Sequence, residues 1–175
     1  MSQDTPPPGK RTGRHMLFVG WAIGLALLVL AFGSWEEGQY NPNRELQSQT
    51  TGEMREVILE GNRFHHYVAT GHVNGVEVTF LLDTGATDVV VPANLATALG
   101  LQPGARGYAQ TANGQVEIRR TTIDELALGP IKLHNVRASI NPGMSGKEIL
   151  LGMSALRQVE LVQRQNQLTL RQYTP

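Results

Sequence analysis

In the stretch "VEVTFLLDTGATDVVVP", residues 76–92, a strand pattern ends directly at an acidic residue. A period of two in its first half predicts a half-buried strand. The apolar positions of that period are Val76, Val78, Phe80 and Leu82. Asp83 follows at once, although a buried carboxylate is costly unless it is paired or used chemically. The turn through Thr84 and Gly85 would place this carboxylate where the sheet opens, and the simpler alternative is that Asp83 only starts a polar turn.

Composition limits the classes of function that remain. The 175 residues suit one domain with additional segments. Fifteen Lys and Arg balance fifteen Asp and Glu, so no net charge favours nucleic acid as a partner. The chain has no Cys, which excludes disulfides, thiolate metal sites and a Cys nucleophile. The adjacent His65 and His66 would face opposite sides of a strand, so we expect no metal and no cofactor.

The N-terminal region predicts a membrane anchor. Residues 16–35 carry no charge, and about 20 apolar residues in a helix cross a bilayer. Lys10, Arg11 and Arg14 precede the run, and basic flanks stay in the cytoplasm. A cleavable signal peptide is the alternative, but no A-x-A-like cleavage site follows the run. We therefore expect a single-pass protein of the cytoplasmic (inner) membrane whose C-terminal domain is extracytoplasmic, in the periplasm.

Four segments follow from these patterns. We expect a cytoplasmic tail over residues 1–15, the transmembrane anchor over 16–35, a polar linker over 36–56 and the folded domain over 57–175.

Asn-Gly pairs favour tight hairpins, because both residues tolerate positive φ. Such pairs occur in the folded domain at Asn74-Gly75 and at Asn113-Gly114.

The remaining elements of the folded domain are short. Apolar and β-branched runs predict further strands at 64–73, 107–112, 115–123, 131–140, 148–152, 159–163 and 167–171. Two short helices are expected, at 93–99 before a left-handed Gly100 and at 153–159. The fold class is therefore all-β, as a small closed barrel or sandwich with one or two short helices, preceded by a single transmembrane helix.

Three segments in this order resemble the retropepsin-like (clan AA) aspartic proteases. They are "FLLDTGATDVVVP" (80–92), "GYAQTANGQVEI" (107–118) and "EILLGMSAL" (148–156). With the N-terminal anchor, the chain looks like the membrane-anchored bacterial branch of that clan. The resemblance implies a small closed barrel-like retropepsin fold. Where retroviral members often carry an acidic pair, this chain has Thr87 and Asp88, so substrate contacts do not transfer.

The resemblance also implies roles for residues of the D-T-G-A loop and of the hairpin between the two outer segments. Asp83 would be the catalytic acid, Thr84 would hold two loops together across a dimer, and Gly85, followed by Ala86, would back the substrate. The hairpin around Asn113 and Gly114 would be the flap that closes over a polypeptide.

Paired-carboxylate hydrolysis needs two acids that share a proton, and this chain has one D-T-G. Asp88 and Asp124 lack the Thr-Gly or Ser-Gly that would follow a second catalytic acid. The resemblance thus implies a homodimer in which a second chain supplies its own Asp83. We expect strands near the domain ends, around residues 55–59 and 166–171, to pair across the two-fold axis.

The predicted function is that of a membrane-anchored aspartic endopeptidase. One alternative is a non-catalytic domain of the same fold that binds peptides or a partner, and another is a dimerisation module on a membrane stalk. Binding of a statine-type transition-state mimic would separate the enzyme from both alternatives.

Arg119 and Arg120 are interpreted as an ordinary solvated pair on a strand.

Overall fold

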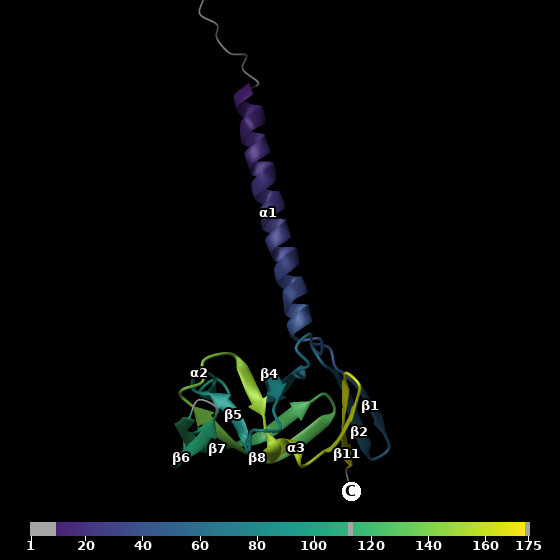
Figure 1. Ribbon diagram of the computed structural model, residues 1–175, viewed down its shortest axis with the longest axis vertical. Coiled ribbons are helices and arrows are strands. Elements are labelled where there is room, and N and C mark those ends of the chain that lie inside the picture. Colours follow the sequence, from purple (N-terminus) through teal and green to yellow (C-terminus); the bar gives the residue numbers. More distant parts are fainter. Residues whose placement is uncertain (1–9, 112–113, 174–175) are drawn as a thin grey trace, which may run out of the picture. The chain divides into compact units, whose positions relative to one another are not determined.

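The computed structural model describes residues 10–111 and 114–173, and the chain divides into two compact units between Gln39 and Tyr40 (Figure 1). The first unit consists of most of helix α1 (Lys10–Tyr40). Within α1, His15–Tyr40 is long and apolar enough to cross a membrane by length and composition, a test that a signal sequence also passes. The apolar run at residues 16–35 therefore lies in a helix that is long enough to be either a membrane anchor or a signal sequence.

The second unit is built around a seven-stranded sheet. Its spatial order is β3 (Val68–Val73), β4 (Val76–Leu82), β9 (Glu148–Leu151), β5 (Val89–Pro92), β8 (Ile131–Asn141), β7 (Gly114–Leu128) and β6 (Arg106–Thr111). A further pairing of β3 with β7 closes the sheet on itself. The short helices are α2 (Ala93–Ala96) and α3 (Met153–Leu156). The prediction of a closed barrel-like β fold with one or two short helices is confirmed, and there are two such helices among the described residues.

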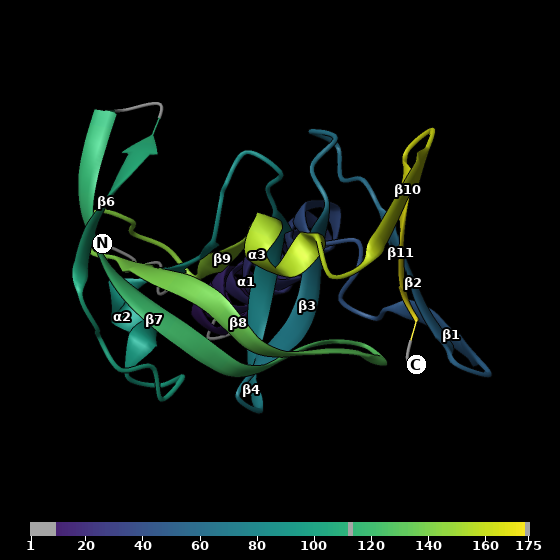
Figure 2. The same cartoon turned by 90° about the horizontal axis from the view of Figure 1, so that it is seen from below.

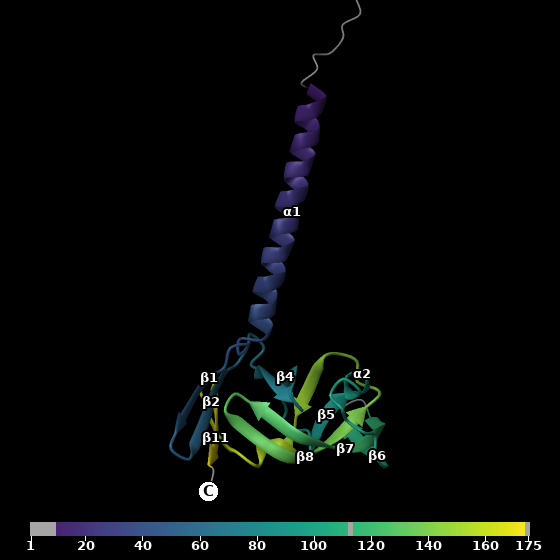
Figure 3. The same ribbon diagram turned by 180° about the vertical axis from the view of Figure 1, so that it is seen from behind.

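A second sheet of four strands joins the two ends of the folded unit. Its order is β1 (Gln47–Thr51), β2 (Met54–Glu60), β11 (Gln167–Tyr173) and β10 (Glu160–Arg164). This sheet lies at the opposite end of the unit from the β6–β7 hairpin (Figures 2 and 3).

The expected pairing of the terminal strands across a dimer axis is not found. Strands β2 and β11 pair with each other within one chain, with Ile58 opposite Thr169. Their outer sides are occupied by β1 and β10, each of which joins its neighbour through a tight turn. Neither β2 nor β11 therefore offers a free edge to a second chain.

The expected linker over residues 36–56 is wrong for most of its length, because the folded unit starts at Tyr40. Asn43 is buried, and its side chain receives the backbone N–H of Glu60 (2.7 Å) and donates to the carbonyl of Val68 (2.7 Å). Asn41 is also buried and donates to Thr70 Oγ1 (3.0 Å). The sequence did not predict this part of the fold, because its residues are mostly polar. Strand β1, for example, is exposed along its whole length and has no apolar period.

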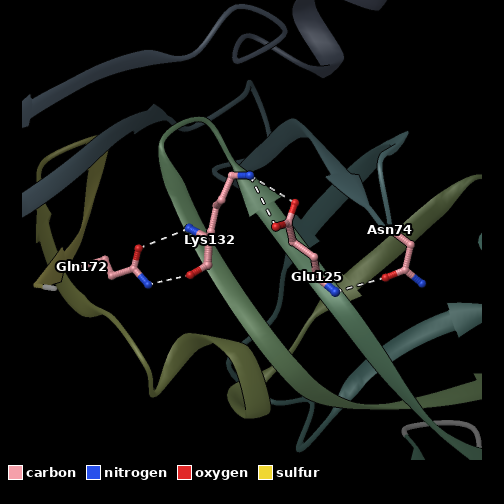
Figure 4. Close-up of polar contacts among 4 residues, drawn as sticks. All are labelled: Asn74, Glu125, Lys132 and Gln172. Atoms are coloured by element: carbon pink, nitrogen blue, oxygen red, sulfur yellow. Dashed lines mark hydrogen bonds and ion pairs between the residues drawn. The ribbon is translucent and has the colours of Figure 1, made fainter.

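A polar chain of contacts connects the two sheets (Figure 4). Gln172 of β11 binds the backbone of Lys132 in both directions, at 3.2 Å to the N–H and 2.6 Å to the carbonyl. Lys132 pairs with Glu125 (3.3 Å), whose N–H donates to Asn74 Oδ1 (3.1 Å). Asn74 and Gly75 have φ of 50° and 80°, as expected for the predicted tight hairpin.

Both predicted helices and the strand predicted from residue 64 are shorter than expected, and the second helix ends at Leu156 rather than at residue 159. The first helix ends at Ala96 rather than at residue 99, although Gly100 does adopt a left-handed φ of 69°. The strand predicted from residue 64 starts only at Val68. The segment before it is a loop around buried Asn62, whose Oδ1 accepts the N–H groups of Phe64 and His66. Side-chain hydrogen bonds to a loop backbone compete with strand formation.

Candidate active site

Asp83 lies in a loop that follows β4 and passes the end of the next strand in the sheet, β9, before β5 begins. The loop connects β4 to β5, and β9 lies between these two strands, parallel to β4. The Asp83 N–H donates to the carbonyl of Leu151 at the end of β9 (3.2 Å). The loop is therefore fastened to a segment nearly 70 residues later in the chain.

The carboxylate of Asp83 is oriented by its own loop. The N–H of Gly85 donates to Asp83 Oδ1 (2.9 Å), and the N–H of Ala86 donates to the Asp83 carbonyl (3.2 Å). Asp83 is half-buried, whereas Thr84 and Gly85 are exposed. Because one carboxylate oxygen is bonded within the loop, the other is left to act on a water or a substrate.

Gly152 and α3 support the loop from behind. The N–H of Met153 donates to the Ala86 carbonyl (2.8 Å), and that of Ser154 donates to the Thr87 carbonyl (2.9 Å). A Cβ on Gly152 would overlap the carbonyl oxygen of Asp88 and lie 2.7 Å from that of Ala86. Only glycine fits this approach, which gives "LLG" at the end of β9 a physical reason.

The Ser154 hydroxyl joins three elements behind the site. It accepts the N–H of Val89 on β5 (3.0 Å) and donates to the carbonyl of Arg137 on β8 (2.7 Å). Ser154 is buried, and Val89 has no exposed surface. This hydrogen-bonded hydroxyl fixes where β5 begins, and hence where the Asp83 loop ends.

A cleft of about 630 Å³ opens over the loop. Its walls come from the Asp83 loop, from the β6–β7 hairpin and from β8. The lining residues that matter most here are Asp83, Asp88, Tyr108, Ile118, Arg120 and Asn141. A concave site that brings a few polar groups together is the usual form of a binding site for a ligand.

The β6–β7 hairpin, predicted from the sequence to be a flap, contributes residues to the lining of the cleft. Thr111 pairs with Gly114, Thr111 Oγ1 donates to the Gly114 carbonyl (2.8 Å), and Gly114 has φ of 105°. Asn113, the other predicted flap residue, lies outside the described residues. Tyr108, on β6, is 69% exposed and lines the cleft. In the strand register Tyr108 lies opposite Glu117, on the face of the hairpin away from Ile118 and Arg120.

The other two acids considered from the sequence have different surroundings. Asp88 lines the cleft but forms an ion pair with Arg137 (2.9 Å). Asp124 is exposed on β7 and is not among the described residues that line the cleft. Asp83 is therefore the one cleft acid, in the described part of the chain, that is free of an ion pair.

The sequence did not identify Ser154 or Arg137 as residues that support the site, and it did not show that Arg120 lines the cleft. Ser154 directly follows the "LLG" pattern, but nothing in its neighbours marks it as buried. Arg119 and Arg120 do not act as a pair, because they lie on opposite faces of β7 and line different cavities.

Comparison with known proteins gives one family and several relatives. Residues 69–158 match the family model described as gag-polyprotein putative aspartyl protease. An uncharacterized protein from the cobV 5′ region of Sinorhizobium sp. is 31% identical over 121 residues, 67% of this chain and 52% of that protein. The uncharacterized protein RP867 of Rickettsia prowazekii is 25% identical over 145 residues, 78% of this chain and 62% of that protein. The chain thus spans between half and two thirds of the length of these relatives.

The structural comparison agrees with the family match. A crystal structure of a retropepsin-like aspartic protease from Rickettsia conorii superposes with a TM-score of 0.60 and 25% identity. The match covers 74% of this chain and all of that one. The similarity supports a retropepsin-like fold for the second unit.

Proposed function

Because this chain belongs to the gag-polyprotein aspartyl protease family, we propose that it is an aspartic endopeptidase in which two chains each contribute Asp83. The observation that carries the proposal is the setting of Asp83. Its carboxylate is oriented by the N–H of Gly85 (2.9 Å) and lines a cleft of about 630 Å³. The cleft is large enough for several residues of an extended peptide, and the β6–β7 hairpin forms one of its walls.

A single chain provides only half of the required chemistry. Hydrolysis by paired carboxylates needs one that is ionised and one that is protonated. Asp88 cannot readily serve as the second acid, because Arg137 holds it in an ion pair. We therefore place the second acid in an identical chain, related by a two-fold axis that runs between the two Asp83 residues.

The proposed reaction balances within this pair. The ionised Asp83 takes a proton from a water, whose oxygen forms a bond to the scissile carbonyl carbon. The protonated Asp83 gives its proton to the carbonyl oxygen, and a tetrahedral gem-diol results. One hydroxyl then returns its proton to a carboxylate as the carbonyl re-forms, and the C–N bond breaks while the nitrogen takes up the other proton. The pair is left with one shared proton, as it began.

The neighbouring residues have supporting roles in this proposal. Thr84, exposed on the loop, would bond to the second chain's loop, and Gly85 would back the substrate without a side chain in its path. Ala86 ties the loop to α3 through its carbonyl. The hairpin around Asn113 and Gly114 would close over the peptide.

We also propose that residues 16–35 anchor the enzyme in the cytoplasmic membrane, with residues 1–15 in the cytoplasm and the folded unit in the periplasm. Helix α1 is long enough to cross the membrane, and the basic residues Lys10, Arg11 and Arg14 lie at its N-terminal end, before the apolar span. An anchor would confine copies of the chain to one surface, which raises their effective concentration for dimerisation.

The test is subunit mixing with Asp83→Asn, which keeps the shape of the side chain but cannot carry the shared proton. The homogeneous variant should cleave no peptide while binding one normally. In an equal mixture with wild type, random pairing should leave about a quarter of the activity, since one dimer in four has both acids. Retention of about half would mean that one chain suffices and that a second acid exists elsewhere. A wild-type chain that binds peptides, cleaves none and ignores a statine-type mimic would instead be the non-catalytic domain.

A further inference from the structure

Arg120 lies on the face of β7 that lines the cleft, beside Ile118 and across from Ser139 of β8. Its neighbour Arg119 points to the other face and lines a separate cavity next to α2. Two adjacent arginines on one strand therefore face different surroundings, and only one of them shares the cleft with Asp83.

Both backbone polar groups of Arg120 are hydrogen-bonded to the segment that precedes β6. Its N–H donates to the carbonyl of Ala105 (2.9 Å), and its carbonyl accepts the N–H of Gly104 (2.8 Å). A Cβ on Gly104 would lie 2.8 Å from that carbonyl, so glycine is needed for this contact. Arg120 is thus held at the base of the hairpin rather than at its tip.

The side chain extends across a gap left by a glycine on the neighbouring strand. Its Nε lies 3.4 Å from where a Cβ on Gly107 would stand, and Gly107 also lines the cleft. A Cβ at this position would make an ordinary van der Waals contact with Nε, and a longer side chain would compete with the guanidinium for space. Arg120 and Gly107 thus lie side by side in the lining of the cleft.

The charge of Arg120 is uncompensated within the described part of the chain. Three charged side chains line the cleft there, namely Asp83, Asp88 and Arg120. Asp88 is neutralised by Arg137, and Asp83 is occupied by the proposed chemistry. The ion pairs found among residues 10–111 and 114–173 do not include Arg120. A peptide entering the cleft would displace water from this cation, which favours a carboxylate over a neutral or basic group.

We infer that Arg120 selects substrates that carry an acidic side chain, Asp or Glu, close to the scissile bond. This inference rests on the proposed function and names the class of substrate for the same site. Arg120 binds the substrate in this scheme and takes no part in proton transfer. Arginine suits the task, since its planar fork binds a carboxylate through two parallel hydrogen bonds.

The experiment uses the full chain in detergent micelles with peptides that differ at one position. Each position on either side of the cleaved bond carries Glu, Gln or Lys in turn. At one position, wild type should have a kcat/KM for Glu about threefold above that for Gln, with Lys lowest, as expected for an ion pair with an exposed arginine. Arg120→Ala should bring the Glu-to-Gln ratio to about one, and Arg120→Glu should favour Lys. Arg119→Ala, on the opposite face, is the matched control and should keep the wild-type ratio.

Three results would overturn the inference. Wild type could show no acidic preference at any position, Arg119→Ala could lose the preference as fully as Arg120→Ala, or Arg120→Ala could slow all three peptides equally. The last result would mean that Arg120 acts on Asp83 rather than on the substrate.

Peptide binding to Asp83→Asn keeps this test separate from that of the proposed function. A chain that binds the Glu peptide better through Arg120 but cleaves nothing would refute the endopeptidase and retain the selectivity. A chain that cleaves through Asp83 without any charge preference would do the reverse.

Discussion

Ser154→Ala tests whether the support behind the Asp83 loop stabilises the folded unit. The substitution removes one oxygen atom that serves two backbone groups on different strands, the N–H of Val89 (3.0 Å) and the carbonyl of Arg137 (2.7 Å). Val89 has no exposed surface and Ser154 is 3% exposed, so water cannot replace the lost hydroxyl without a rearrangement. A buried donor without a partner costs about 1–3 kcal/mol, and the carbonyl adds a smaller loss. We therefore expect the free energy of unfolding to fall by about 2–4 kcal/mol.

The assay is pulse proteolysis of the detergent-solubilised full chain across a urea series, which reports the fraction of folded protein. Fluorescence of tryptophan is unsuitable, because Trp21 and Trp35 both lie in α1. Ser145→Ala is the matched control, since Ser145 is exposed and its loss should change stability by less than about 0.5 kcal/mol. If Ser154→Ala is no more destabilising than Ser145→Ala, the hydroxyl does not hold β5 and β8 together and the reasoning fails.

Two further outcomes are expected. The guanidinium of Arg171 (2.6 Å), followed by the amide of Gln49, holds the pKa of Glu56 below its ordinary value of 4.5. Glu56→Gln should therefore lower the free energy of unfolding by about 1 kcal/mol at neutral pH, with the difference from wild type disappearing as the pH falls below 4.5. Glu117→Gln removes a carboxylate from an exposed ion pair and should change the free energy of unfolding little. An equal loss of stability in both variants at all pH values would contradict the role of the Glu56 pair. A reporter fused after Pro175 should be active only in the exported compartment, and cytoplasmic activity would reverse the proposed topology.

Local patterns in the sequence predicted most of the strands, because their signals are contained within a few residues. The alternation through Val76–Leu82 and the paired Asn74-Gly75 each encode their structure in adjacent positions. The polar strand β1 carries no such period, since all of its residues are exposed and it is held by its pairing with β2. Asn43 was equally undetectable, because its partners at Glu60 and Val68 are 17 and 25 residues away.

The residues of the candidate site also differ in whether the sequence could predict them. Asp83 and its loop were predicted from one contiguous motif. The residues that hold that motif in place come from elsewhere, as with Ser154, which reaches back 65 residues to Val89. Nor does a strand pattern reveal what each face will meet, so the different surroundings of Arg119 and Arg120 depended on where α2 and the cleft lie.

The intrachain pairing of β2 with β11 constrains how a catalytic dimer could form. Both strands are interior members of their sheet, so a second chain could add to it only along β1 or β10. That sheet lies at the far end of the unit from the β6–β7 hairpin (Figure 2). The proposed dimer, in contrast, brings two Asp83 carboxylates together at the cleft. Thr84 and Gly85 are exposed beside Asp83 and are free to contact their counterparts on a two-fold axis. The dimer proposed here must therefore be built around the Asp83 loop, and substitutions at Thr84 should weaken it more than changes along β1.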